Sequence, residues 1–293
     1  VMDSRWLYIR NYRPDLPYVQ PLEYMFRAQG YKSWARLARE GKLTPSTARF
    51  WGEKPTEELY DMDADPDNVT NLAADPREAK TMEQMRAALQ DHVVRTFDNG
   101  FLPEGSALEG YENSRRLGVF PVDRVFALAN LASERKAENL PELITALCDP
   151  SEPVRWWAAQ GCAMLGNEAK PAGKDLHACL DDDSGAVQIA AAEALARQGE
   201  TDAALPVLQR WIGQTDNLAF NLQAGNVLAR LGESARPALP ALESARLAAA
   251  KLKGDPTTGE NYPSALLTHV LDCLQGRLEA LVHPDLTSVP PTP

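Results

Sequence analysis

An acidic stretch near residue 60 has the residue types and the spacing of a calcium-binding loop. Asp61, Asp63 and Asp65 match the first, third and fifth positions of an EF-hand loop, whose oxygen ligands hold Ca²⁺. Its sixth position, normally glycine, is Pro66, and its twelfth, normally a bidentate glutamate, is Leu72. We therefore expect no calcium site here. We interpret the aspartates as turn residues whose carboxylates accept hydrogen bonds from nearby backbone amides.

The cysteines and histidines do not combine into a predicted catalytic or metal-binding set. The cysteines show no C-x-x-C spacing and lie at apolar positions of expected helices, which favours small core residues over disulfides or metal ligands. They are Cys148, Cys162, Cys179 and Cys273. His92, His177 and His269 are interpreted as structural or surface residues. No Ser/His/Asp, Cys/His or metal cluster is apparent in the sequence. We therefore predict no reaction that this chain would catalyse alone.

Charge is distributed unevenly along the sequence. The formal net charge of −11 argues against nucleic acid and anionic membranes as partners. Residues 1–55 hold ten Lys and Arg against five Asp and Glu, whereas residues 56–112 hold four against fourteen. The basic segment fits either attraction of an anionic substrate or a solvated surface with local ion pairs. Its cations include Arg10, Arg13, Arg27, Lys32, Arg36 and Arg39.

Two strands and a long helix are expected to position the residues of the first part of the chain. The strands are Arg5–Tyr12 and Glu57–Met62, and the helix runs from a capping-box sequence at Asp75 to Phe97. Spacings of three and four place the apolar residues of the helix on one face, against the sheet. These residues are Leu72, Met82, Met85, Leu89, Val93 and Phe97. The prediction is an α+β subdomain, a small antiparallel sheet packed on a long helix, over residues 1–110.

A change of composition predicts a domain boundary after this subdomain. From Asp98 to Pro121 the sequence is rich in Gly, Pro, Glu and Ser without periodicity, and we place the linker at residues 111–120. The last residues, 283–293, contain four prolines and are expected to be a disordered tail.

Between these segments lies an internal repeat with a period of 33 residues. Val154–Gly166, Val187–Gly199 and Phe220–Gly232 superimpose without a gap, with alanines at matching positions and a glycine at the end of each. Small alanines let helices approach closely, and a terminal glycine adopts the left-handed conformation that ends a helix. We name these three stretches the B-helices. Each follows a shorter A-helix and an acidic turn, which predicts stacked helical hairpins.

This arrangement resembles HEAT repeats, and about four units fit into residues 121–282. The predicted fold of this part is an all-α HEAT-like solenoid. A solenoid fold offers a surface that could bind a protein partner, but it does not by itself indicate a catalytic reaction. Trp156, Trp157 and Trp211 fit either an exposed recognition ridge or, as for most aromatics at helical spacing, the core.

The first part of the chain carries a second resemblance. The sequence E-L-Y-D-M-D-A-D-P-D-N-V-T-N-L, at Glu58–Leu72, resembles a segment near the C-terminus of sulfatases. There a strand ending in E-L-Y-D-L is followed by an acidic turn and N-L. The similarity extends to Arg5–Tyr18, Arg49–Pro55 and Asp98–Gly105. Heparan-N-sulfatase-like and arylsulfatase-like members are the most similar.

The sulfatase resemblance implies a catalytic domain outside this chain. Sulfatases use a formylglycine made from Cys or Ser in a C/S-x-P-x-R motif, beside a cluster that binds a divalent metal, calcium. The nearest sequence here, C-D-P-S-E at Cys148–Glu152, has Glu in place of Arg and falls within the repeats. The chain is therefore expected to be the C-terminal portion of a sulfatase, inactive alone and without a cofactor of its own. The resemblance also implies a periplasmic or extracytoplasmic bacterial location.

By the same resemblance, the subdomain would brace its own N-terminal catalytic domain and contribute to the rim of the substrate pocket. Arg10 and Arg13 are the candidate substrate-binding residues, because a guanidinium pairs well with sulfate. A structural role is the alternative for each arginine. The alternative for the whole chain is a non-enzymatic HEAT-repeat interaction module that carries a sulfatase-like platform.

Overall fold

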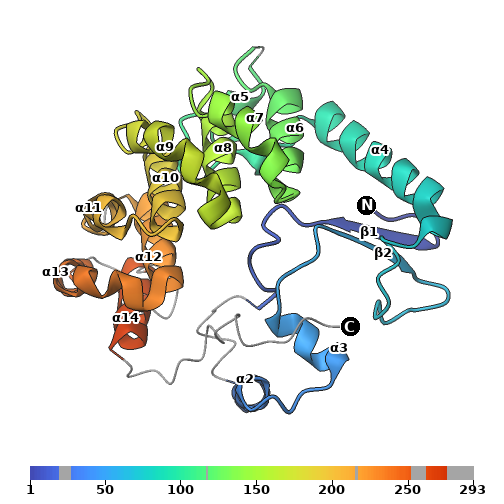
Figure 1. The fold of residues 1–293 in the computed structure, drawn as a ribbon, viewed down its shortest axis with the longest axis horizontal. Coiled ribbons are helices and arrows are strands. Elements are labelled where there is room, and N and C mark those ends of the chain that lie inside the picture. Colours follow the sequence, from blue (N-terminus) through green and yellow to red (C-terminus); the bar gives the residue numbers. More distant parts are fainter. Residues whose placement is uncertain (20–27, 117, 215–216, 252–261, 276–293) are drawn as a thin grey trace. The chain divides into compact units, whose positions relative to one another are not determined.

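The computed structural model describes residues 1–19, 28–116, 118–214, 217–251 and 262–275. Contacts divide these residues into two compact units, separated between Asp98 and Asn99 (Figure 1). We call residues 1–98 the sheet unit and residues 99–275 the repeat unit. The predicted tail 283–293 and Arg27 lie outside the described residues.

The sheet unit contains two antiparallel strands and three α-helices among its described residues. The elements are β1 (Trp6–Arg10), α2 (Gln29–Arg39), α3 (Pro45–Ala48), β2 (Glu57–Asp61) and α4 (Ala79–Thr96). Tyr8 of β1 lies opposite Leu59 of β2. Both strands are shorter than predicted. One further ladder-type bond follows the last pair, Arg10 and Glu57, since the amide of Asn11 donates to the carbonyl of Thr56.

An apolar cluster joins the two strands and α4. Tyr8, Leu59, Met82 and Met85 form its buried part. Its partly buried members are Trp6, Leu72, Ala73 and Leu89. Phe97 of the predicted stripe is instead exposed, since it ends α4 in the left-handed conformation with φ of 49°. The helix begins with a 3₁₀ turn, in which the Asp75 side chain accepts from the backbone amide of Arg77, as expected of an N-cap.

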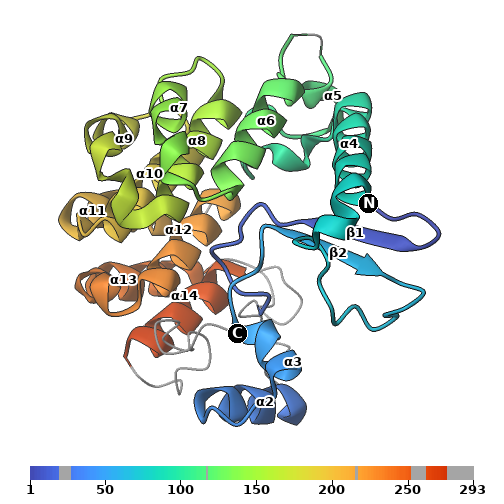
Figure 2. The same ribbon diagram turned by 45° about the vertical axis from the view of Figure 1, so that its right-hand side comes forward.

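The repeat unit is a two-layer stack of helices. Helices α6, α8, α10, α12 and α14 each pack against the next in one layer, and α7, α9, α11 and α13 pack against that layer (Figures 1 and 2). The bounds are α5 (Tyr111–Ser114), α6 (Val122–Ser133), α7 (Leu140–Ala146), α8 (Glu152–Leu165), α9 (Gly173–Cys179), α10 (Gly185–Arg197), α11 (Thr201–Ile212), α12 (Leu218–Leu231), α13 (Leu239–Ala249) and α14 (Tyr262–Leu274). The predicted B-helices are α8, α10 and α12.

Small residues set the spacing between these helices. Ala158, Ala191 and Ala224, which match in the 33-residue alignment, are fully buried. One close approach is at Gly161 of α8, where an added Cβ would lie 2.7 Å from Leu143 Cδ2. At the ends of α8 and α12, Gly166 and Gly232 have φ of 56° and 52°, values that glycine adopts readily.

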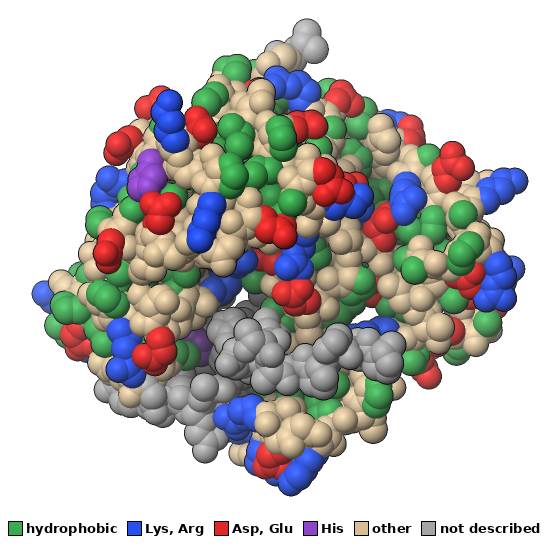
Figure 3. All heavy atoms as spheres, in the orientation of Figure 1, with side chains coloured by type: hydrophobic (Ala, Val, Ile, Leu, Met, Phe, Trp, Pro, Cys, Tyr) green, Lys and Arg blue, Asp and Glu red, His purple; other side chains and the backbone are tan. Residues whose placement is uncertain are grey.

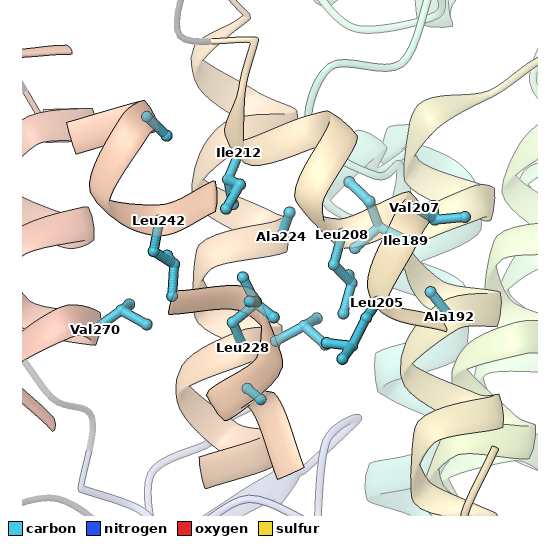
Figure 4. Packing of buried hydrophobic residues seen from close by; sticks show 14 of the residues in the cluster. Ile189, Ala192, Leu205, Val207, Leu208, Ile212, Ala224, Leu228, Leu242 and Val270 are labelled. Atoms are coloured by element: carbon cyan, nitrogen blue, oxygen red, sulfur yellow. The ribbon is translucent and has the colours of Figure 1, made fainter. Parts of the chain in front are cut away.

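Leucine, isoleucine and valine side chains fill the space between the layers. Figure 4 shows them converging from five successive helices, α10 to α14. Leu208, Leu228 and Leu242 are fully buried there.

The connecting turns are held by arginines. Arg124 pairs with Asp149, and Arg155 makes two hydrogen bonds to Asp182, at 2.7 and 2.8 Å. The acidic turns predicted between A- and B-helices are therefore anchored to the helix of the preceding repeat.

Candidate functional site

The E-L-Y-D sequence places a carboxylate inside the sheet unit. Glu58 is buried, and its carboxylate accepts hydrogen bonds from Asn11 Nδ2, at 2.7 Å, and from the Tyr60 hydroxyl. Residues 58 and 60 share one face of β2, so strand alternation brings both side chains to the same side of the sheet. Burial, followed by the hydrogen bond to Glu58, raises the pKa of Tyr60 above its ordinary value of 10.0. Tyr60 therefore stays a neutral donor.

Arg49, from the R-F-W-G sequence, connects this strand to the acidic turn. Its guanidinium donates to the Tyr60 hydroxyl at 3.1 Å and to the backbone carbonyls of Asn68 and Val69 at 2.9 and 2.8 Å. Three of the sequences that carry the sulfatase resemblance thus meet around one buried polar network. The roles that the structure gives them are structural.

The acidic turn uses its carboxylates as predicted, to accept local hydrogen bonds. Asp61 accepts from the backbone amides of Asp63 and Ala64 at 3.2 and 3.3 Å, and Asp65 accepts from that of Thr70 at 2.7 Å. The guanidinium of Arg5, 2.5 Å from Asp61, is the main cause that lowers the pKa of this carboxyl. Among the described residues, no group of three or more His, Cys, Asp and Glu side chains is arranged to hold a metal ion.

The N-L pair that ends the sulfatase-like sequence closes the outer edge of β2. Asn71 Oδ1 accepts from the Leu59 amide at 2.9 Å, and its Nδ2 donates to the Glu57 carbonyl at 3.0 Å. The Leu72 amide donates to the Leu59 carbonyl at 2.8 Å. The asparagine side chain therefore substitutes for a neighbouring strand and satisfies backbone groups that an open edge would leave exposed.

Both candidate substrate-binding arginines have a carboxylate partner within the sheet unit. Arg10 is nearly buried, with Nη1 at 3.5 Å from Glu57 Oε1. Arg13 Nε and Nη2 donate to the two oxygens of the buried Asp15 at 2.9 and 3.0 Å. These pairs are compatible with the structural role that was the alternative for each arginine. Contact with a substrate stays a prediction for both.

Glu57 is the centre of a second carboxylate network. It accepts from Arg86 Nε and Nη2, both at 2.6 Å, and from the Tyr8 hydroxyl at 2.6 Å. Burial works to raise the pKa of Glu57, but the hydrogen bonds from Arg86 and Tyr8 outweigh it, and the pKa lies below the ordinary 4.5. This ionised glutamate links β1, β2 and α4.

Much of the remaining basic surface of the sheet unit is paired locally. Arg36 and Lys42 both contact Glu40, at 2.9 and 2.8 Å. On the face drawn in Figure 3, acidic and basic side chains of the described residues alternate. These pairs favour the interpretation of a solvated surface for this part of the basic segment.

The cysteines differ in their surroundings. Cys162 and Cys179 are buried, and burial raises the pKa of their thiols to about 12 and about 11. Cys148 is exposed, which corrects the expectation of a core residue, because it lies in the turn after α7. In the same C-D-P-S-E sequence, Glu152 accepts hydrogen bonds from the Ser106 and Ser184 hydroxyls.

Two contacts of the histidines were missed by sequence reasoning. His177 Nε2 lies 2.7 Å from Glu200 Oε2, in the following repeat, and no local pattern signals that pair. His269 Nε2 lies 3.6 Å from Cys273 Sγ, one turn further along α14, a spacing that the sequence does contain. Neither contact is part of a larger cluster of metal-ligand side chains in the described chain.

Comparison with known proteins finds two similarities. Residues 173–251 match the family model of HEAT repeats. An ulvan-active sulfatase of Formosa agariphila is 35% identical over 109 residues, which are 37% of this chain and 18% of that protein. This chain thus spans less than a fifth of the length of that relative. No solved structure matches the chain. No described helix is long and apolar enough to cross a membrane. The chain therefore contains HEAT repeats, and part of it is similar to part of a sulfatase.

Proposed function

We propose that this chain is the C-terminal portion of a sulfatase, which hydrolyses sulfate esters or N-sulfo groups of sulfated sugars or related compounds. The observation that carries the proposal is the 35% identity to a sulfatase over 109 residues. The network around Glu58 supports it, since residues from Arg49 to Leu72 that carry the resemblance hold one compact turn together.

In this proposal the sheet unit braces a catalytic domain that precedes it in the protein. The formylglycine and the calcium ion would belong to that domain, which would be the first partner of the sheet unit. We derive no catalytic step from the residues described. A periplasmic or extracytoplasmic bacterial location accompanies the proposal, on the strength of the same resemblance.

Arg13 is the better of the two candidates for the pocket rim. Its side chain is 22% exposed, against 9% for Arg10, and its partner Asp15 is only two residues away. In the whole enzyme, we expect Arg13→Ala to raise KM for a sulfated sugar several-fold with little change in kcat.

Arg77→Ala is a matched control for this experiment. Arg77 also pairs with an aspartate two residues away, Asp75, through several hydrogen bonds. It is an exposed residue at the start of the long helix. An unchanged KM for Arg13→Ala, or an equal rise for both variants, would show that Arg13 does not contact the substrate.

A second candidate function is a non-enzymatic interaction module. The match of residues 173–251 to HEAT repeats favours it, because such arrays are surfaces for partners. The natural reading frame upstream of Val1 separates the two candidates. A C/S-x-P-x-R motif with an Asp-rich metal cluster in that frame supports the sulfatase. An unrelated upstream domain, or a start codon close to Met2, supports the interaction module.

A further inference from the structure

Residues 99–109, which we call the strap, pack against the repeat unit although they lack any periodic pattern. Phe101 and Ser106 are buried. The ring of Phe101 contacts the rings of Phe126 and Trp157, with centroids 5.4 and 6.1 Å apart. The strap begins in the Gly- and Pro-rich segment that the sequence analysis placed at the domain boundary. Its contacts make it part of the repeat unit.

Two main-chain carbonyls of the strap accept hydrogen bonds from the same position of two repeats. Trp157 Nε1 donates to the Phe101 carbonyl at 3.0 Å, and Gln223 Nε2 donates to the Glu104 carbonyl at 2.9 Å. Trp157 and Gln223 are the fourth residues of the first and third B-helix sequences, and the second repeat has Ala190 there. The acceptors are main-chain carbonyls, so these donors would bind the backbone of a peptide with a suitable path.

A second set of contacts selects particular strap residues. Glu152, the first residue of α8, accepts from the Ser106 hydroxyl and, at 2.6 Å, from the hydroxyl of Ser184, the N-cap residue of α10. At Gly105, an added Cβ would lie 2.8 Å from Phe220 Cε1 and 2.9 Å from Ala219 Cβ, and φ is +80°. The surface therefore has a place for an aromatic ring, a place for glycine and an acceptor for a hydroxyl.

We propose that the N-terminal turns of the B-helices α8 and α12 form a peptide-binding surface, and that the strap occupies this surface in cis. The ligand is an aromatic residue followed, four and five residues later, by glycine and serine. A partner protein that binds these turns must displace the strap. This proposal is independent of the sulfatase proposal, because it concerns only contacts within the repeat unit.

The test uses the full chain and a labelled synthetic peptide of residues 98–110. Gly105→Val introduces a Cβ at a position with no room and should release the strap. The released surface should bind the peptide about tenfold more tightly than wild type does, because the tethered strap no longer competes at its high effective concentration. Hydrogen exchange of the strap amides should accelerate in the same variant.

Two further variants keep the test decisive. Gly118→Val is the matched control, since Gly118 has a similar φ of +76° and an added Cβ there would meet nothing within 4 Å. It should bind the peptide as weakly as wild type. Phe101→Ala removes the aromatic anchor from the strap and leaves the surface intact, so it should repeat the effect of Gly105→Val. In the Gly105→Val background, Gln223→Ala should weaken peptide binding several-fold.

The proposal is overturned if neither Gly105→Val nor Phe101→Ala binds the peptide more tightly than wild type. It is also overturned if Gly118→Val gains binding to the same extent. In either case the strap contacts would be packing alone, with no separable binding surface beneath them.

Discussion

The two units of this chain are held together in different ways. In the sheet unit, carboxylates collect donors from distant segments, as Glu57 does from Tyr8 and Arg86. In the repeat unit, the same small residue recurs at the same position, as at Ala158, Ala191 and Ala224. A polar network requires specific side chains, whereas close packing of helices requires only small size and apolar character.

This difference explains why the two units have different kinds of sequence signal. The sheet unit has a literal string, E-L-Y-D with a later N-L, because Tyr60, Asp61 and Asn71 each satisfy a particular partner. The repeat unit has a period and not a string. Its 33-residue spacing persists while individual residues change, as at the position occupied by Gly161, Ala194 and Val227.

The largest expected effect comes from removing the carboxylate at the centre of the sheet unit. Glu58→Ala leaves the Tyr60 hydroxyl and the Asn11 amide without their acceptor in a buried site, and should destabilise the unit by about 3 kcal/mol. Hydrogen exchange of the β1 and β2 amides measures this loss. Glu83→Ala, at an exposed position of α4, is the control and should change little. If Glu58→Ala and Glu83→Ala lowered the stability equally, the buried carboxylate would not be what holds the sheet unit together.

Overpacking a close helix contact should have the next largest effect, in the repeat unit alone. Gly161→Val puts carbon within 2.7 Å of Leu143 Cδ2 and 3.1 Å of Ala132 Cβ, and should cost about 2 kcal/mol of unfolding free energy. Gly173→Val is the control, because an added Cβ there would be 3.6 Å from the nearest atom, Glu200 Oε1. Urea denaturation followed by circular dichroism compares the two variants. A Gly161→Val chain as stable as wild type would contradict the close packing.

A smaller effect is expected where the repeat unit does use a polar pair. Arg155→Ala removes two hydrogen bonds to Asp182, and also one to the Asp149 carbonyl. Because the arginine is partly exposed and water can replace some of these bonds, the loss should be about 1–2 kcal/mol. Thermal unfolding measures this loss. In the same measurement, Arg95→Ala, which removes an exposed pair with Asp91, should change the stability by no more than the experimental error. A larger loss for Arg95→Ala would reverse this ranking.

The smallest effect is a dependence of the sheet unit on acid. The folded pKa of Glu57 is depressed below 4.5, so its ionised form is stabilised by folding. This contribution is fully present above the unfolded pKa, and it is lost as pH falls from about 4.5 through the lower folded pKa. Arg86→Met, which removes the strongest partner of Glu57, should flatten that part of the curve of β2 exchange against pH. An unchanged curve would show that Glu57 does not contribute.

Sequence reasoning reached the local features of both units. The Asp-rich turn, the N-cap at Asp75 and the B-helices follow from residue types and short spacings, and the structure contains them. It did not reach contacts between distant residues. The bond of Asn11 to Glu58 spans 47 positions, and the bond of Gln223 to Glu104 spans 119. No periodicity or local propensity encodes such pairs.

The candidate site shows the same limit. The arginines at residues 10 and 13 were selected because a guanidinium suits sulfate, a property of the side chain alone. Their partners Glu57 and Asp15 depend on how β1 and the loop after it are folded. The strap was invisible for a further reason, since its Gly- and Pro-rich composition indicates a linker whether or not the segment is packed.

The most direct test of the central claim is to measure sulfatase activity in two proteins. One is residues 1–293, and the other is the same chain with its natural upstream sequence. The claim is that the residues resembling a sulfatase hold structure here and that catalysis lies outside this chain. It predicts turnover of an aryl sulfate by the longer protein and none by residues 1–293. Turnover above background by residues 1–293 alone would contradict it.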